Sequence, residues 1–258
     1  MDLQIKDQLF VVCGATSGFG KATAEALVTE GAKIIAVARG EEKLTALQKT
    51  APAQIEILAG DISESNVIKR VIGLIGSRKL SGILINAGGP PAKTVMETTL
   101  EDWDNAYKSL LRWKIELTQS IVPLMVNAGY GRIVFIESAS VKQPLENLVL
   151  SNSLRVAVVN MAKTLSQEIA RKGVTINILA PGSHNTPAID RTIKKKSEQE
   201  NISFEEAKKK AVANMPVGFF GEAEDFASLA VWLLSPQSKF ITGQTFSVDG
   251  GAVRGIFG

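Results

Sequence analysis

Short apolar runs alternate along the chain with longer segments in which apolar residues recur at helical spacing. The short runs are rich in β-branched residues and apolar throughout, as is typical of parallel strands buried on both faces. They predict seven strands, at residues 9–13, 33–38, 55–59, 82–85, 132–136, 175–179 and 245–248. The segments between them predict helices at residues 19–30, 41–49, 64–77, 101–127, 150–171 and 222–235. This alternation predicts a single doubly wound, Rossmann-like α/β domain over residues 1–258, with helices on both faces of a parallel sheet of about seven strands.

One segment interrupts the alternation. Residues 187–215 carry two lysine triplets, Lys194–Lys196 and Lys208–Lys210, among several glutamates. Mixed charge with few apolar residues predicts solvated helices on the rim of the domain. Because ligands bind at the carboxyl ends of the strands in such sheets, this segment has the position of a substrate lid. A charged excursion on the surface accounts for its composition equally well.

Composition narrows the class of function. The 258 residues include 29 Lys and Arg against 26 Asp and Glu, a small excess that does not predict a nucleic-acid or membrane surface. No apolar run approaches the roughly 20 residues of a membrane span, and no targeting segment is visible. A single cysteine, Cys13, excludes an internal disulfide, and a single histidine, His184, makes a metal site unexpected. We expect a cytoplasmic enzyme or binding protein without a metal.

A glycine-rich turn follows the first strand and precedes a helical segment. Gly14, Gly18 and Gly20 lie in this turn. Glycine lets the backbone approach a pyrophosphate, and the N-terminus of the following helix supplies N–H groups and a positive dipole end. A glycine motif alone is also typical of a tight turn, but the order of strand, turn and helix predicts a nucleotide site.

From these glycines onward the chain resembles the short-chain dehydrogenase/reductase family, in particular its 3-oxoacyl-carrier-protein-reductase-like members, over nearly its full length. The shared motifs are Gly14, Gly18 and Gly20, Gly60-Asp61-Ile62, Asn86-Ala87-Gly88, Ser138, Pro181-Gly182 with Thr186, Gly243, and Asp249-Gly250-Gly251. The resemblance implies that a nicotinamide dinucleotide is held by Gly14, Thr16, Ser17, Gly18, Phe19 and Gly20. It also implies that Asp61 and Ile62 hold the adenine, that Asn86, Ala87 and Gly88 flank its ribose, and that Pro181, Gly182 and Thr186 cradle the nicotinamide.

The end of the second strand bears on which nicotinamide cofactor is used. A carboxylate there is typical of NAD, because it accepts hydrogen bonds from the ribose hydroxyls. Ala38 and Arg39 take that place, and a guanidinium can bind a 2′-phosphate through two hydrogen bonds. Ser17 on the glycine loop can donate another. Glu41 and Glu42 suit the first turn of the next helix, where acids favour the dipole. We therefore predict NADP(H).

The family pattern fails at the catalytic residues. The resemblance implies a serine that polarises the carbonyl, here Ser138, and a tyrosine four residues before a lysine. Ser151 and Arg155 occupy those two positions and share a helix face. A serine hydroxyl is a far weaker acid than a phenol, and a guanidinium stays protonated. Arg155 is expected to bind ribose hydroxyls and to stabilise a developing alkoxide. Loss of the general acid typically lowers the reaction rate by about 10²- to 10⁴-fold.

Other positions offer few substitutes. The family's asparagine on the preceding helix falls on Leu110. Tyr107 and His184 are alternative proton donors, although a packed aromatic and a solvated loop histidine are the simpler interpretations. Tyr130 precedes the fifth strand at the far edge of the sheet and is interpreted as structural. Lys114 interrupts an apolar stripe and requires a partner, for which we favour an interface salt bridge.

These observations favour an NADP-dependent oxidoreductase that acts on a small carbonyl or alcohol substrate, with an atypical site of Ser138, Ser151 and Arg155. The alternatives are a catalytically weak or inactive NADP-binding sensor or assembly protein and a cofactor-free dehalogenase-like lyase. Relatives of the last kind keep the tyrosine and lose the glycine loop, the reverse of this chain. We expect no nucleic-acid or membrane partner. We also expect a homo-oligomer, a tetramer or dimer, because two long helices carry apolar surface beyond what the sheet can cover, including Leu111, Trp113, Val156 and Val159. The resemblance implies that these helices and the C-terminal strand form the interfaces.

Overall fold

The computed structural model describes residues 1–86, 88–213 and 215–256. Its seven strands form one all-parallel sheet in the order β3-β2-β1-β4-β5-β6-β7. The strands are β1 (Leu9–Cys13), β2 (Lys33–Ala38), β3 (Ile55–Ala59), β4 (Leu80–Ile85), β5 (Gly131–Ile136), β6 (Val174–Pro181) and β7 (Thr245–Val248). All seven predicted strands are confirmed, and so is the doubly wound α/β fold.

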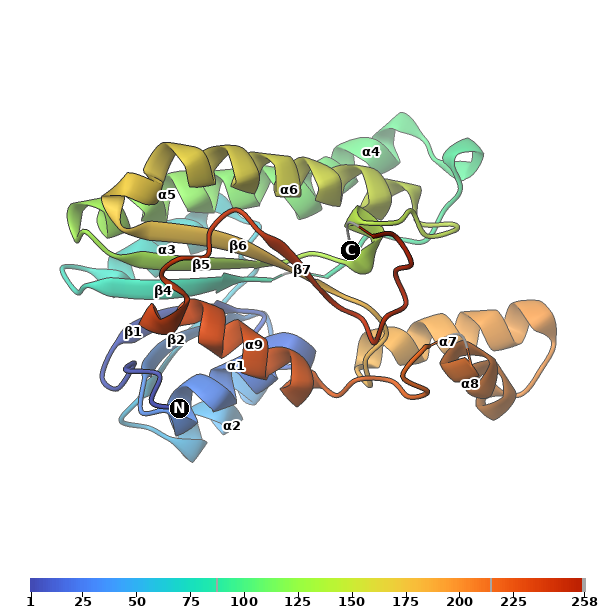
Figure 1. The fold of residues 1–258 in the computed structure, drawn as a ribbon, viewed down its shortest axis with the longest axis horizontal. Helices are drawn as coiled ribbons and strands as arrows, with labels where there is room; N and C mark the ends of the chain where they lie inside the picture. Colours follow the sequence, from blue (N-terminus) through green and yellow to red (C-terminus); the bar gives the residue numbers. More distant parts are fainter. Residues whose placement is uncertain (87, 214, 257–258) are drawn as a thin grey trace.

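Helices cover both faces of this sheet (Figure 1). On one face lie α3 (Ser65–Ile75), α5 (Trp113–Asn127) and α6 (Val149–Ile169). On the other lie α1 (Gly18–Thr29), α2 (Glu41–Thr50) and α9 (Ala223–Leu234). Successive residues of a strand point to opposite faces, so Val11 packs with the first group of helices and Val12 with the second. Two apolar cores result, which explains why the strands are apolar at nearly every position.

The helix predicted over residues 101–127 is interrupted. It consists of α4 (Leu100–Tyr107), a π-helical turn η2 (Lys108–Arg112) and α5. A π-turn adds one residue to a helix, which rotates the following side chains by about 100° relative to an unbroken α-helix. Leu110 lies in this turn and Trp113 directly after it, and both are fully buried. Trp113 is therefore part of the core, and its predicted place on an interface is wrong.

The charged segment at 187–215 folds into α7 (Pro187–Glu200) and α8 (Phe204–Ala213). In Figure 1 the two helices form a separate pair beyond the end of the sheet. They enclose a small apolar core made of Ile193, Ala207, Met215 and Phe220. The segment is thus a folded unit with its own interior, and its function as a substrate lid stays a prediction.

Within residues 1–86, 88–213 and 215–256, no helix has the length and apolar character needed to cross a membrane. In the same ranges, no group of three or more His, Cys, Asp or Glu side chains is arranged to hold a metal ion.

Candidate cofactor and catalytic site

The motifs recognised in the sequence meet at the carboxyl edge of the sheet. Strands β1, β4, β5 and β6 are neighbours, so the loops that follow them lie side by side, at the edge where ligands of such sheets bind. The glycine loop follows β1, Asn86 and Gly88 follow β4, and Ser138 follows β5. Pro181 is the last residue of β6. Ala87, which was also predicted to bind the cofactor, lies outside the described residues.

The glycine loop packs too closely for larger residues at two positions. Gly14 has a φ of +69°, and a Cβ atom there would lie 2.8 Å from Nδ2 of Asn86. A Cβ on Gly20 would lie 2.2 Å from the carbonyl oxygen of Gly14, which no side chain tolerates. The remaining predicted loop residues, Thr16, Ser17, Gly18 and Phe19, lie between these glycines and lead into α1.

The N-terminus of α1 is open to an anion. Its N-cap, Ser17, makes no side-chain capping hydrogen bond to a described residue. The N–H groups of the first helical turn carry the positive end of the helix dipole and can bind a phosphate group. A close-packed glycine turn beneath an uncapped helix N-terminus therefore fits the pyrophosphate of a dinucleotide.

The residues predicted at the adenine end lie on neighbouring strand ends. Arg39 is exposed directly after β2, and Asp61 and Ile62 follow β3. Oδ1 of Asp61 accepts hydrogen bonds from the backbone N–H and the hydroxyl of Ser63, at 3.0 and 2.7 Å. Burial opposes the charged form of Asp61, but these hydrogen bonds and the Arg39 charge lower the pKa of the carboxyl below its ordinary value. Arg39 thus lies near Asp61, beside the predicted adenine site.

At the other end, the loop after β6 closes onto the glycine loop. Cγ2 of Thr186 lies 3.5 Å from where a Cβ on Gly18 would be, and Thr186 is the N-cap of α7. His184 is buried, with Nδ1 3.1 Å from the carbonyl oxygen of Gly182 and its ring edge-on to Phe19. The interpretation of His184 as a solvated loop residue is wrong. Its ring packs this loop against the glycine loop.

The two tyrosines lie on α4 and just before β5. Tyr107 is 43% exposed on α4, so its interpretation as a packed aromatic is wrong. Tyr130 precedes β5 at the opposite, amino edge of the sheet, where the Arg132 guanidinium lies 4.3 Å from its ring centre. Burial raises the pKa of Tyr130 above its ordinary value. Its position agrees with the structural interpretation.

Helix α6 brings the two replaced catalytic positions together. Ser151 and Arg155 are both buried and lie one helical turn apart, and Nε of Arg155 donates a 3.0 Å hydrogen bond to Oγ of Ser151. Ser138 caps the short 3₁₀ turn η3 (Ala139–Val141), where its Oγ accepts a hydrogen bond from the N–H of Ser140. Helix α6 packs against this turn. The shared helix face predicted for Ser151 and Arg155 is confirmed.

A buried ionic cluster lies behind Arg155. Nη1 of Arg155 donates to Oε2 of Glu137 at 3.0 Å, and Nζ of Lys114 donates to Oε1 of the same carboxylate at 2.5 Å. The Glu137 side chain is fully buried and that of Lys114 is 1% exposed. Burial lowers the pKa of the Lys114 ammonium, while the Glu137 charge opposes that effect. The interface salt bridge predicted for Lys114 is therefore wrong, because its partner lies inside the same chain.

Glu137 was not among the predicted site residues, yet the sequence contains a signal for it. The residue follows the apolar run of β5 directly and precedes Ser138, so a carboxylate is placed where burial is expected. Lys114 is an equally isolated charge on an apolar helix stripe. Because a buried charge requires a partner of opposite sign, the two isolated charges predict that Lys114 and Glu137 form an ion pair.

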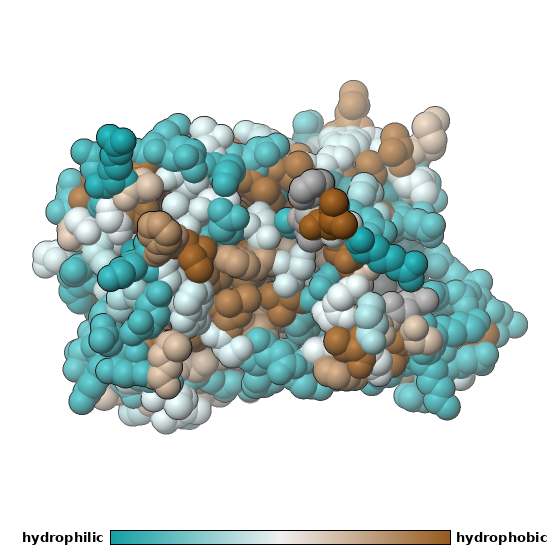
Figure 2. All heavy atoms as spheres, viewed as in Figure 1, coloured by the Kyte–Doolittle hydropathy of each residue, from teal (hydrophilic) through white to brown (hydrophobic). Residues whose placement is uncertain are grey.

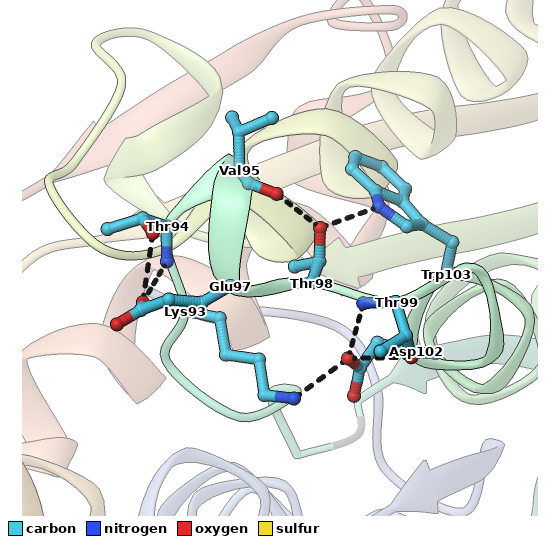
Figure 3. Close-up of polar contacts among 8 residues, drawn as sticks. All are labelled: Lys93, Thr94, Val95, Glu97, Thr98, Thr99, Asp102 and Trp103. Carbon is cyan, nitrogen blue, oxygen red and sulfur yellow. Dashed lines mark hydrogen bonds and ion pairs between the residues drawn. The ribbon is translucent and has the colours of Figure 1, made fainter.

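The segment between β4 and α4 borders this site, and Figure 3 shows the polar contacts that hold it. Lys93 pairs with Leu148 in a short parallel bridge just before α6. Its Nζ also donates to Oδ2 of Asp102 at 2.8 Å, and Asp102 in turn forms a capping box with Thr99 at the start of α4. The hydrogen bonds from Lys93 and Thr99 lower the pKa of Asp102 to about 2. These contacts tie the start of α4 to the strand-edge loops.

Comparisons with known proteins agree with this geometry. A family model described as enoyl-(acyl carrier protein) reductase matches residues 14–253. The 3-oxoacyl-[acyl-carrier-protein] reductase FabG of Thermotoga maritima is 27% identical over 97% of this chain and its own full length. The NADPH-dependent reductase BacG of Bacillus subtilis is also 27% identical, over 95% of this chain and 97% of its own.

A solved structure extends the likeness to three dimensions. The L-sorbose reductase of Gluconobacter frateurii, crystallised with NADPH and L-sorbose, superimposes with a TM-score of 0.92 at 26% identity. The match covers 99% of this chain and 100% of that one. With the parallel sheet, the glycine loop at its carboxyl edge and a family match over most of the sequence, the chain belongs to the short-chain dehydrogenase/reductase family.

Proposed function

We propose that the protein is an NADP(H)-dependent reductase of a small carbonyl compound, in which Ser151 and Arg155 stand in place of the usual tyrosine and lysine, beside the retained serine Ser138. The observation that carries this proposal is the burial and the hydrogen bonding of the Arg155 guanidinium. It is buried, bound to Ser151 and Glu137, and its Nη2 atom makes no hydrogen bond to any residue within the described ranges. Nη2 lies 3.6 Å from where a Cβ on Gly89 would be, in the loop after β4. Nη2 of Arg155, whose guanidinium is held in place by Ser151 and Glu137, thus faces the carboxyl edge of the sheet, where ligands bind.

The binding residues support NADP(H) as the cofactor. The glycine loop and the uncapped N-terminus of α1 would hold the pyrophosphate, and Asp61 the adenine. Arg39, exposed at the end of β2 where no acid stands, would bind the 2′-phosphate. NADPH, when bound, supplies the hydride. The names of BacG and of the L-sorbose reductase complex, both of which mention NADPH, support the same assignment.

The reaction that fits these side chains is reduction with electrostatic stabilisation of the product oxygen. Addition of a hydride to a carbonyl leaves negative charge on the oxygen. Because Oγ of Ser151 accepts from Arg155, its own hydrogen is free to donate to that oxygen, and Ser138 can donate a second hydrogen bond. Arg155 adds a positive charge in a water-poor site, where such interactions are strongest. Neither serine nor guanidinium releases a proton readily near neutral pH, so the proton comes from water.

The test is an assay of NADPH binding and consumption with ketoses, diketones and β-keto thioesters. Binding is measured by fluorescence quenching, and we expect slow turnover of at least one class. Arg155→Met should lower kcat by about 10²- to 10³-fold, the usual effect of removing one stabilising donor. Arg171→Met, which makes the same change at an exposed arginine just beyond the C-terminal end of α6, is the matched control. Failure to bind NADPH would overturn the proposal.

One observation favours a second candidate function, a weak or inactive NADP-binding sensor or assembly protein. No phenol stands at position 151, and the two tyrosines of the chain lie elsewhere. Tight NADPH binding with no consumption in any substrate class would support this candidate. The retained glycine cradle argues against the cofactor-free lyase.

A further inference from the structure

The cluster of Lys114, Glu137 and Arg155 places two cations on one carboxylate inside the protein. The Arg155 side chain is 8% exposed and the other two still less. Removing charges from water is costly, and replacing such clusters by apolar residues often stabilises a protein. A cluster of this kind therefore contributes little to folding stability, and its position beside the site suggests a function in the reaction.

The geometry connects the cluster to every proposed catalytic group. Glu137 is the backbone neighbour of Ser138, and its main-chain and side-chain oxygens both accept hydrogen bonds from Nη1 of Arg155, at 3.1 and 3.0 Å. Nε of Arg155 is bound to Ser151. These bonds fix the plane of the guanidinium and leave Nη2 facing the loop at Gly89. One carboxylate thus determines where Nη2 of Arg155 lies.

Lys114 affects the net charge of the cluster and not the orientation of Arg155. A Glu137–Arg155 pair alone would be neutral, and its attraction for a developing negative charge would be weak. The Lys114 ammonium, held by α5 directly after the π-turn, offsets the Glu137 charge. Two cations and one anion leave one net positive charge at the site, which in a buried environment acts over several ångströms with little screening.

We propose, on the basis of the function proposed above, that Glu137 is a positioning residue that aims Arg155 at the reacting oxygen. Lys114 is the buried counter-charge that keeps the cluster positive. The two residues therefore affect different measurable quantities. Glu137 controls the orientation of the guanidinium, whereas Lys114 controls the charge that stabilises the product oxygen.

Three variants separate these effects, namely Glu137→Gln, Lys114→Met and the double variant. Glu137→Gln should broaden the NMR signal of the Arg155 Nε–H group and weaken NADPH binding. It should also lower kcat/KM by about 100-fold, because displacing a catalytic group by about 1 Å has an effect of that size. Lys114→Met should leave the Arg155 signal and the affinity for NADPH unchanged and lower kcat alone. Glu116→Gln, which removes a carboxylate bound to Ser65 elsewhere on α5, is the matched control and should change none of these quantities.

The double variant is decisive, because it restores one net positive charge without restoring the anchor. We expect it to recover thermal stability but to keep the broadened Arg155 signal and the weakened NADPH binding of Glu137→Gln. Recovery of all three properties would show that the cluster only balances charge and would overturn the positioning of Arg155 by Glu137. If the wild type reduces no carbonyl compound, the proposed function fails, yet the NMR signal and the NADPH affinity still decide whether Glu137 positions Arg155.

Discussion

At position 151, a serine hydroxyl accepts a hydrogen bond from Arg155 where the family pattern has a phenol next to a lysine. Restoring that pair as Ser151→Tyr with Arg155→Lys should raise reductase activity toward a generic ketone by up to about 10²- to 10⁴-fold, because a phenol beside an ammonium is an effective general acid. The measurement is the rate of NADPH consumption by the wild type, both single variants and the double variant.

Ser138 provides the control for this restoration. Ser138→Ala in the restored protein should abolish the gain, because that hydroxyl still has to hold the substrate oxygen. A restored pair that binds NADPH and stays inert would contradict the prediction. The pocket, with Leu110 buried at the π-turn, would then not admit the ketone.

Arg39 is expected to determine whether the protein prefers NADPH or NADH. Arg39→Asp should reverse the preference from NADPH to NADH, since a carboxylate repels the 2′-phosphate and accepts hydrogen bonds from the ribose hydroxyls. Titration of both cofactors by fluorescence quenching checks this. Equal affinities of the wild type for NADPH and NADH would show that Arg39 does not bind the phosphate.

Elements were predicted more accurately than the contacts between them. The seven strands could be located because each is an apolar run bounded by turns, and apolar runs that short have few other structures available. The π-turn could not be predicted, because one added residue barely disturbs the apolar spacing of a long helix. That residue changes which side chains at the start of α5 turn inward, and Trp113, which was assigned to an interface, is buried. The pairing of Lys114 with Glu137 joins α5 to the end of β5 across 23 positions of sequence, a contact that helix periodicity does not reveal.

Asp102, at the start of α4, should make the stability of the fold depend on pH. The pKa of Asp102 is lowered from 3.8 to about 2 by its hydrogen bonds to Lys93 and Thr99, so the ionised carboxylate stabilises the folded state at any pH above about 4. This contribution is lost as the pH falls from about 4 to about 2. Asp102→Asn should therefore melt at a lower temperature than the wild type near neutral pH, and the difference should disappear near pH 2. A difference in melting temperature that is independent of pH would assign the effect to packing.

At the scale of the whole molecule, an uncovered edge and exposed apolar side chains support self-association. Strand β7 is the last of the sheet, and Figure 2 shows apolar residues gathered at the centre of the face that contains it. Phe240, in the turn before β7, is fully exposed. We predict a tetramer or dimer of the 27.6 kDa chain, measured by light scattering at micromolar concentration. Phe240→Asp should shift the distribution toward smaller species, and a monomeric wild type would contradict the prediction.

The order of the strands also has a consequence for synthesis on the ribosome. Each strand pairs with one made earlier: β2 and β3 extend the sheet on one side of β1, and β4 to β7 extend it in sequence on the other. No strand has to be inserted between two that are already paired, so the nascent chain can assemble the sheet in the direction of translation. The glycine loop, Ser138 and Arg155 are all synthesised before the end of β6 at residue 181. At roughly 5–20 residues per second, residues 182–258 follow over about 4–15 seconds, during which a nucleotide can reach the glycine loop before α7, α8 and β7 exist.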